Sequence, residues 1–375
     1  MRILMVTQFF APVTGGEERL VEDLRDALGA RGHHVSVATT TESTAGPFEG
    51  DARVHRVRTT MGRLPGLHAD DARRHTPPFP DPEAVLGLRR IIAEERPDVV
   101  HCHNWLVHST LPALGRSRTP LVLTLHDYGQ VCANKRLTRD GRVCEGPRLD
   151  RCLPCSREHY GSLKGVPTAL VMRPASAAVL RRVDMFLPIS DAVAGSSGLI
   201  GSGRPYEVIP DFVPDALLEP APPGQAPSGL PDGDFIVFAG DVSIDKGIGP
   251  LLDAHARLPH APPLVVVGRI LPDQIDARRP NVLVLGPRPH AELMEIFRRS
   301  LAVMVPSVWA EPFGLVALEG MAMGRPVVAS DVGGLATMIE DGVSGILVAP
   351  GDVAGLAAAM ERLCGSAELR ERMGR

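Results

Sequence analysis

The sequence predicts an α/β protein that consists of two Rossmann-like domains. The chain has 375 residues, which is more than one ordinary domain contains. Short apolar runs alternate with amphipathic helical patterns, as is typical of parallel sheets covered by helices. The alternation stops at residues 211–234, which are rich in Pro and Gly, and then begins again. We therefore expect an N-terminal domain over residues 1–212 and a C-terminal domain over residues 213–375, facing each other across a cleft.

The N-terminal half opens with a strand, a glycine loop and a helix. Ile3–Thr7 is a continuous apolar run, as expected for a parallel strand that is covered on both faces. Residues 12–16 interrupt this run, and Glu17–Leu28 has the apolar spacing of an amphipathic helix. Further strands are expected at His34–Ala38, Asp98–His101, Leu121–Leu125, Phe186–Ile189 and Glu207–Ile209.

The C-terminal half repeats the pattern of strands and helices. Its strands are expected at Phe235–Ala239, Leu264–Val267, Val282–Leu285, Ala302–Pro306, Pro326–Ala329 and Gly345–Val348. Open sheets of this kind bind their ligands beyond the carboxyl ends of the strands. Polar residues that directly follow a strand are therefore the first candidates for a functional site.

The composition argues against several classes of protein. The net charge is −4, whereas proteins that bind nucleic acids are usually basic. No apolar run reaches the roughly 18 residues that a membrane-spanning helix needs. The apolar run near the N-terminus is too short for a signal peptide. We expect a cytoplasmic protein that does not bind nucleic acid.

Two carboxylates follow a predicted strand of the C-terminal half. The strand Ala302–Pro306 leads into a loop that contains Glu311, and Gly314 permits a tight entry into a helix that contains Glu319. The unpaired N–H groups at such a helix start suit a diphosphate. The loop carboxylate could accept hydrogen bonds from sugar hydroxyls, and the helical one could bind a ribose diol. Each glutamate alone is explained equally well as a solvated acid or as an acid near a helix N-terminus.

The residues from Val305 to Glu319 resemble the E-x7-E signature of the retaining glycosyltransferases of family 4, which have the GT-B fold. The resemblance extends through MAMGRPVVASDVGG and DGVSGILVAPGD and covers essentially the whole chain. It implies that Glu311 binds the donor sugar and that Glu319 binds the nucleotide ribose. The backbone that would hold sugar hydroxyls and phosphate comprises Phe313, Gly314, Leu315 and Val316.

The resemblance also implies a reaction. A hexosyl-type sugar would move from a nucleotide-diphosphate sugar to a hydroxyl acceptor with retention of configuration. The C-terminal domain would bind the donor, and the N-terminal domain would lie on the side of the acceptor, which is a polysaccharide, a lipid or a small molecule. No D-x-D-type acidic pair stands at a strand end, so we expect that catalysis needs no metal or other cofactor.

Residues 240–247 resemble the family's G-R-x-x-x-x-K-G loop, in which Arg and Lys neutralise the donor diphosphate. Lys246 matches, and an ammonium group suits a leaving phosphate. Asp241 stands where the family has Arg, and a carboxylate would repel phosphates that it faced. Either Asp241 turns away, or another cation such as Arg269 or Arg288 supplies the charge. Taken alone, Lys246 could also be an ordinary surface lysine.

The N-terminal half contributes a glycine loop and several histidines. Gly15 and Gly16, in TGGE, resemble the family's glycine loop that faces the donor, and glycine lets the backbone approach a ligand closely. His126, in LTLHDY, matches the family's T-x-H-D segment, which implies a hydrogen bond to the donor sugar and a catalytic role. A packed histidine that holds a loop is the alternative. We expect His101 and His103 to support this loop rather than to line an acceptor pocket.

Four cysteines fall within a short insertion at about residues 130–160. A C-x2-C pair and two further thiols are the right number for a closed tetrahedral zinc site. The sequence therefore predicts a structural zinc that orders this core-poor insertion, although four reduced thiols are the alternative. The predicted ligands are Cys132, Cys144, Cys152 and Cys155.

The insertion begins a basic stretch. Residues 135–182 contain eleven Lys and Arg against four acidic residues. A solvated surface would explain this charge, and so would an anionic acceptor or peripheral attachment to the inner face of a membrane.

Two other functions remain open from the sequence. A nucleotide-sugar epimerase shares the GT-B fold, but it would need acid–base groups that we cannot place. A non-catalytic protein that binds a nucleotide sugar or assists another transferase is the second alternative. Asp241 favours it, as does Ala336-Thr337, where the family usually has Pro-Glu.

Overall fold

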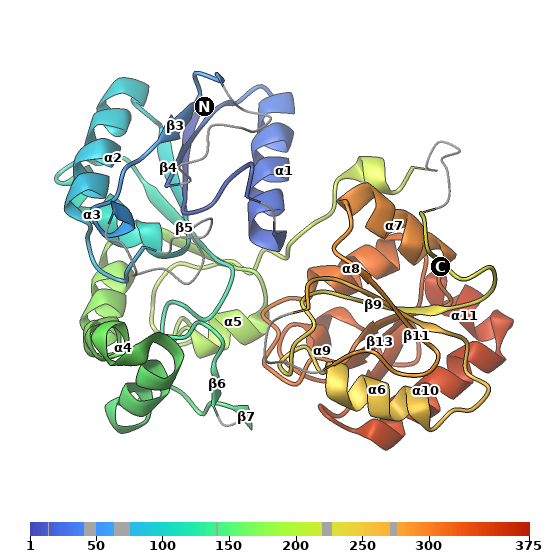
Figure 1. Ribbon diagram of the computed structural model, residues 1–375. Helices are drawn as coiled ribbons and strands as arrows, with labels where there is room; N and C mark the ends of the chain where they lie inside the picture. Colours follow the sequence, from blue (N-terminus) through green and yellow to red (C-terminus); the bar gives the residue numbers. More distant parts are fainter. Residues whose placement is uncertain (14, 41–49, 64–75, 140–141, 220–226, 271–275) are drawn as a thin grey trace. The chain divides into compact units, whose positions relative to one another are not determined.

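The computed structural model describes residues 1–13, 15–40, 50–63, 76–139, 142–219, 227–270 and 276–375 (Figure 1). The chain divides into two compact units, each with a six-stranded sheet whose neighbouring strands are all parallel. Unit 1 comprises Met1–Leu137 and Cys144–Asp211, and unit 2 comprises Thr138–Val143 and Phe212–Arg375. The predicted α/β class with two parallel-sheet domains is confirmed.

Unit 1 has the strand order β3-β2-β1-β4-β5-β8. These strands are β1 (Arg2–Thr7), β2 (His34–Thr39), β3 (Val54–Arg56), β4 (Val99–His103), β5 (Leu121–Leu125) and β8 (Met185–Pro188). Its helices are α1 (Gly16–Ala30), α2 (Pro82–Glu95), α3 (Val107–Leu114), α4 (Leu149–Arg182) and α5 (Asp191–Ser196). The prediction missed β3, which has only three residues. The strand expected at Glu207–Ile209 is not among the strands of the sheet, and Pro205 and Pro210 flank this segment. The segment still runs along β8, because Tyr206 forms an isolated bridge with Phe186, and the N–H groups of Glu207 and Ile209 donate to Phe186 and Pro188.

Unit 2 has the strand order β11-β10-β9-β12-β13-β14. These strands are β9 (Ile236–Ala239), β10 (Leu264–Val267), β11 (Val282–Gly286), β12 (Val303–Val305), β13 (Val327–Ser330) and β14 (Gly345–Val348). Its helices are α6 (Ile248–Ala256), α7 (His290–Arg299), α8 (Leu315–Ala322), α9 (Leu335–Met338), α10 (Val353–Gly365) and α11 (Ala367–Gly374). All six strands predicted for this half are present, and no end differs by more than one residue.

The sheet of unit 2 is buried on both faces. Ile236 and Phe238 of β9 pack in one apolar cluster, whereas Val237 and Ala239 pack in another. Because successive side chains of a strand point to opposite faces, this division places a core on each side of the sheet. It explains why the strands appear in the sequence as continuous apolar runs.

The smaller elements lie outside the two large sheets. A two-stranded antiparallel sheet pairs β6 (Thr138–Arg139) with β7 (Arg142–Val143). Short 3-10 turns are η1 (Met61–Arg63), η2 (Asn104–Leu106) and η3 (Asp215–Leu217). None of the helices in the described part of the chain has the length and apolarity needed to cross a membrane.

The strand order fixes where each unit can bind a ligand. In each sheet the chain order reverses at one place, between β1 and β4 in unit 1 and between β9 and β12 in unit 2. The crevice beyond the carboxyl ends of such a strand pair is the usual ligand site of open α/β sheets. Residues that follow β4, β9 and β12 are therefore in the right place to bind a substrate.

Candidate functional site

Glu311 lies in the loop between β12 and α8, at the carboxyl edge of the unit 2 sheet. It is 8% exposed. Its carboxylate accepts hydrogen bonds from Ser307 Oγ at 2.9 Å and from Trp309 Nε1 at 3.0 Å. Lys246 Nζ donates to both carboxylate oxygens, at 2.8 and 3.0 Å. Three donors thus hold one buried carboxylate in a fixed orientation.

Glycine brings the Lys246 loop against the Glu311 loop. Gly247, the N-cap of α6, has a φ of 72°, and a Cβ at this position would overlap the carbonyl oxygen of Pro306. The N–H of Val308 donates to the carbonyl oxygen of Asp245 at 2.9 Å. The segment after β9 and the segment after β12 are therefore in direct backbone contact, which explains why Lys246 reaches Glu311.

Two further glycines support the Glu311 loop from β13. The N–H of Gly334 donates to the carbonyl oxygen of Glu311 at 2.7 Å. A Cβ at Gly333 would overlap that same oxygen, so this approach requires glycine. The DVGG sequence, which the sequence analysis linked to the family without a role, thus packs directly under Glu311.

The start of α8 points toward the same edge of the sheet. Gly314 precedes the helix with a φ of 106°, which favours glycine. The N–H groups of Leu315 and Val316 belong to the first turn, where N–H groups have no partner within the helix. The site residues predicted around Gly314 therefore lie at a helix N-terminus, which attracts anions.

Glu319 lies one turn further into α8 and is also buried, with 4% exposed. Its Oε1 is 2.9 Å from His290 Nε2, at the start of α7. Sequence reasoning missed His290, and it missed Ser307 and Trp309 as partners of Glu311. The last two lie within four residues of Glu311 in the sequence, so their donor groups are a signal that could have identified them.

The histidines of unit 1 form a buried cluster at the ends of β4 and β5. His103 Nδ1 is 2.9 Å from His126 Nε2, and His101 Nε2 is 2.7 Å from Thr124 Oγ1. His126 Nδ1 is 4.0 Å from Asp211 Oδ1, and both of these side chains are 6% exposed. His103 thus contacts the loop residue His126, whereas His101 contacts Thr124 within β5. Both nitrogens of His126 face groups of unit 1.

Burial determines the charge state of this cluster. It lowers the pKa of His126, of His103 and of His101, the last to about 4. Burial also raises the pKa of Asp211 to about 6, although the neighbouring His126 opposes this shift. Near neutral pH the three imidazoles are uncharged.

The predicted glycine loop precedes α1. Gly15 is the N-cap of this helix in an extended conformation, and Gly16 is its first residue. Next to it, Asn104 Nδ2 donates to Glu17 Oε1 at 2.6 Å, which ties the turn after β4 to the start of α1. Thr14, the first residue of the predicted motif, lies outside the described residues.

Comparison with known proteins agrees with this geometry. Residues 15–211 match the family model described as "Glycosyl transferase 4-like domain", and residues 233–366 match "Glycosyl transferases group 1". The first match alone spans more than half of the chain. The chain belongs to the family 4 glycosyltransferases.

The matches to relatives and to solved structures cover nearly the whole chain. The glycosyltransferase is 29% identical to glycogen synthase of Mycobacterium tuberculosis, over 100% of this chain and 89% of that one. It is 30% identical to D-inositol 3-phosphate glycosyltransferase of Frankia alni, over 96% of this chain and 88% of the relative. Sucrose-phosphate synthase from Thermosynechococcus elongatus has a TM-score of 0.74 at 22% identity, covering 100% of this chain and 92% of its own. HepE of Anabaena in complex with UDP-glucose has a TM-score of 0.70 at 20% identity, covering 99% and 92%. These likenesses confirm the GT-B fold.

The glycosyltransferase departs from its family at Asp241. Arg269, which follows β10, donates to Asp241 through Nε and Nη2, both at 3.0 Å. A Cβ at Gly268 would overlap the carbonyl oxygen of Gly240, so the two loops touch beside this pair. A carboxylate and a guanidinium thus occupy a place where the family has one guanidinium.

Arg288, the other cation considered, is engaged elsewhere in unit 2. Its Nη2 donates to the carbonyl oxygen of Ser228 at 3.3 Å, and its Nη1 is 3.6 Å from Glu292. Its Nε is buried without a hydrogen-bond partner among the described residues. Of the two arginines proposed to replace the missing cation, Arg269 is the one bonded to Asp241.

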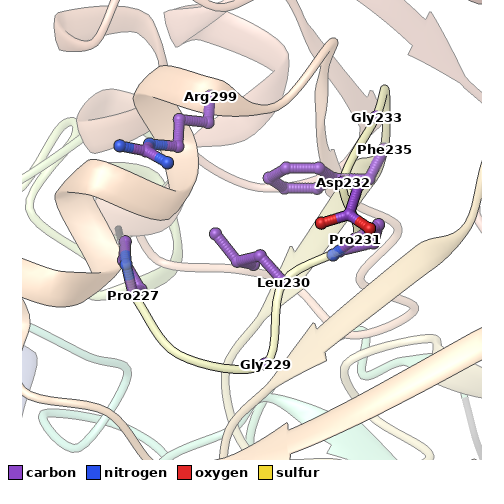
Figure 2. A pocket seen from close by; sticks show the side chains of 8 residues that line it. All are labelled: Pro227, Gly229, Leu230, Pro231, Asp232, Gly233, Phe235 and Arg299. Atoms are coloured by element: carbon purple, nitrogen blue, oxygen red, sulfur yellow. The ribbon is translucent and has the colours of Figure 1, made fainter. Parts of the chain in front are cut away.

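A pocket in unit 2 lies away from this site. Figure 2 shows that it is lined by Pro227, residues 229–233, Phe235 and Arg299. Phe235 precedes β9 and Arg299 ends α7, so the pocket is at the amino edge of the sheet. Lys246 and Glu311 follow the carboxyl ends of β9 and β12, which is the opposite edge.

The predicted zinc site is not formed by the four cysteines. Among the described residues no three His, Cys, Asp or Glu side chains are grouped so that they could hold a metal ion. Instead, Cys132 Sγ donates to Asn134 Oδ1 at 2.9 Å, and Asn134 Nδ2 donates to Cys155 Sγ at 3.3 Å. Burial raises the pKa of Cys132 to about 11, which keeps it a thiol. The described residues therefore do not show the zinc site predicted for Cys132, Cys144, Cys152 and Cys155: an amide lies between two of the thiols, and the C-x2-C pair lies in helix α4. The zinc stays a prediction.

Proposed function

We propose that this glycosyltransferase moves a hexosyl group from a nucleotide-diphosphate sugar to a hydroxyl acceptor with retention of configuration. The observation that carries the proposal is the buried Glu311 carboxylate, held by Ser307, Trp309 and Lys246 at the switch point of the unit 2 sheet. A fixed carboxylate accepts hydrogen bonds from sugar hydroxyls. The family membership supports the same assignment, with unit 2 as the donor domain and unit 1 on the side of the acceptor.

In this proposal Lys246 changes partner when the donor binds. Without donor, its ammonium neutralises Glu311. With donor, the sugar hydroxyls take its place on Glu311, and the ammonium turns to the diphosphate. Its side chain is 30% exposed, which leaves room for that movement. Glu319 would bind the ribose hydroxyls and keep His290 as its second partner.

The chemistry then depends on charge stabilisation. As the bond between the sugar and the diphosphate breaks, negative charge grows on the phosphate and the sugar becomes oxocarbenium-like. Lys246 and the N-terminus of α8 would stabilise the phosphate charge. The acceptor hydroxyl would attack the face that the diphosphate leaves, which retains configuration. We propose that no divalent metal is needed, and full activity in EDTA would support this.

His126 has a more restricted role in this proposal than the family resemblance implies. Its ring can bind the donor sugar only if the contact with His103 is given up, because its other nitrogen faces Asp211. We propose that His103 and Asp211 position the imidazole and fix its tautomer.

The test compares the two glutamates with UDP-glucose as the first donor probe, because the structure of HepE contains UDP-glucose. Glu311→Ala should abolish transfer, since the lost contact is to the sugar, but it should not weaken UDP binding by calorimetry, because it leaves Lys246 free for the diphosphate. Glu319→Ala should weaken UDP binding by about 1–3 kcal/mol, as expected when a charged hydrogen-bonding group is removed. Glu295→Ala, which breaks ion pairs within α7, is the matched control.

Analysis of the reaction products distinguishes a transferase from an epimerase and from a non-catalytic binding protein. Release of UDP that rises when acceptors are added indicates a transferase, and an altered sugar still attached to UDP indicates an epimerase. Binding of nucleotide sugars without turnover indicates a non-catalytic protein. Wild-type transfer by both Glu311→Ala and Glu319→Ala would contradict the donor-site assignment.

A further inference from the structure

Helix α4 of unit 1 consists of two helical pieces. Gly161 interrupts it with a φ of 74° and a ψ of 167°. The second piece, residues 162–182, packs closely on the first, because a Cβ at Gly165 would overlap the carbonyl oxygen of Ser156. The buried residues of the second piece are Gly165, Thr168, Ala169, Met172 and Val179. Figure 1 draws this helix in green.

The opposite face of this piece is apolar and exposed to solvent. Leu163 is 81% exposed and Leu170 is 52% exposed. Pro167 and Pro174 are exposed as well. Spacings of four, three and four residues place these side chains in one stripe along the helix. We call Leu163, Pro167, Leu170 and Pro174 the apolar stripe.

The charged residues of this piece and its ends have one sign. Residues 159–183 contain no Asp or Glu, but they contain Lys164, Arg173, Arg181 and Arg182. The three arginines are exposed, and none of the four cations forms an ion pair with a described residue. This uniform charge contrasts with the whole chain, whose net charge is −4.

We propose that the apolar stripe and its four flanking cations bind an anionic lipid surface. Exposed leucines insert at the boundary between lipid headgroups and acyl chains, while Lys and Arg beside them bind the negative headgroups. A second copy of the chain fits this face poorly, because pairing two such faces would bring eight cations together without counter-charges. The inference does not depend on the chemistry of the donor site.

Vesicle flotation tests this proposal on the full chain. Wild-type protein should float with vesicles of phosphatidylcholine and phosphatidylglycerol in equal parts, and not with vesicles of phosphatidylcholine alone. Binding should weaken as salt is raised, because salt screens attraction between exposed charges. The double variant Leu163→Glu/Leu170→Glu should lower the bound fraction at least about tenfold, and Lys164→Gln/Arg173→Gln should lower it less.

Leu86→Glu is the matched control, since Leu86 is 65% exposed on α2 of the same unit. It should bind vesicles like the wild type. Release of UDP from UDP-glucose without vesicles should be unchanged in the stripe variants, so a failure of membrane binding is distinct from a failure of the donor site.

Three results would overturn the proposal. The first is that the wild type does not bind the anionic vesicles, and the second is that Leu86→Glu loses as much binding as the stripe variant. The third is that the wild type is a dimer that Leu163→Glu/Leu170→Glu converts to a monomer, without any vesicle binding. The last result would assign the stripe to a second copy of the chain.

Discussion

The two sheets follow the same strand order but carry different polar chemistry at their carboxyl edges. In unit 1, the edge around β4 and β5 is occupied by the buried imidazoles of His101, His103 and His126. In unit 2, the edge around β9 and β12 is occupied by opposite charges in contact, Lys246 with Glu311 and Arg269 with Asp241. One edge is kept neutral by burial, and the other is kept neutral by pairing.

The difference separates residues that hold a loop in place from residues that exchange partners when a ligand binds. A neutral imidazole needs no counter-charge, so the unit 1 cluster can hold a loop in the dry interior, but it is sensitive to acid. A paired ammonium and carboxylate can each exchange the other for a ligand group, as donor binding to unit 2 would require. Removing one charge from unit 2 should therefore affect chemistry, whereas changing one histidine of unit 1 should affect stability.

Of the variants that test this comparison, Lys246→Ala should lower activity most. We expect kcat to fall about 100-fold, as is typical when one preorganised group that stabilises transition-state charge is lost. KM should change less, because phosphate charge grows only as the bond breaks. Steady-state kinetics with UDP-glucose and the best acceptor found provide the measurement.

Lys164→Ala is the control for a lysine outside the donor site and should keep the wild-type kcat. Lys246→Arg should recover part of the activity, since it restores the charge with a different shape. An unchanged kcat in Lys246→Ala would mean that the charged edge of unit 2 does not act on the leaving group.

The histidine edge of unit 1 should respond to pH. The folded-state pKa of His101 is about 4, below the unfolded value of about 6.5, so the folded state resists protonation. The contribution of neutral His101 to the free energy of unfolding is therefore complete above pH 6.5 and is lost as pH falls toward 4. At pH 5 the loss is about 2 kcal/mol relative to pH 7.5, which corresponds to 1.5 pH units below the unfolded pKa.

His101→Asn should remove this part of the acid sensitivity while keeping a polar partner for Thr124. Hydrogen exchange of the β4 and β5 amides at pH 7.5 and pH 5, corrected for intrinsic rates, reports the opening free energy of unit 1. Asp211 has the opposite effect. Because its pKa is raised in the folded state, its contribution to the free energy of unfolding is lost as pH rises from about 4 to about 6. His159→Asn, at an exposed histidine, is the control, and an equal pH response in both variants would contradict the burial argument.

The sequence predicted the strands of unit 2 well because each is a short apolar run between polar loops. The spacing of Glu311 and Glu319 around Gly314 led to their assignment to a donor site, and the structure shows that both carboxylates are buried. The sequence could not predict their partners Lys246 and His290, which lie 65 and 29 residues away and meet them only through the sheet topology. The contact between Gly247 and Pro306 is likewise visible only in three dimensions.

The cysteines show where spacing misleads. Four thiols in a short segment satisfy the ligand count for zinc, but among the described residues no three possible ligands are grouped closely enough to hold the ion. The prediction treated the insertion as core-poor, whereas Cys152 and Cys155 belong to the helix α4, and Tyr160 donates to the carbonyl oxygen of Ala133 at 2.9 Å. Helical hydrogen bonds and this tyrosine therefore order part of the insertion, which the sequence alone did not indicate.

The smallest expected effect tests whether Asp241 and Arg269 replace the family arginine. Arg269 is 53% exposed, so water screens it more than Lys246, and we expect Arg269→Ala to lower kcat/KM about tenfold, or about 1.4 kcal/mol. Asp241→Arg in the Arg269→Ala background should recover most of this loss, because it returns one guanidinium to the same loop edge. Asp241→Ala alone should cost less, since it frees Arg269 without removing its charge. Wild-type kcat/KM in Arg269→Ala, or a double variant no better than the single one, would show that Lys246 and the α8 N-terminus hold the diphosphate without a second cation.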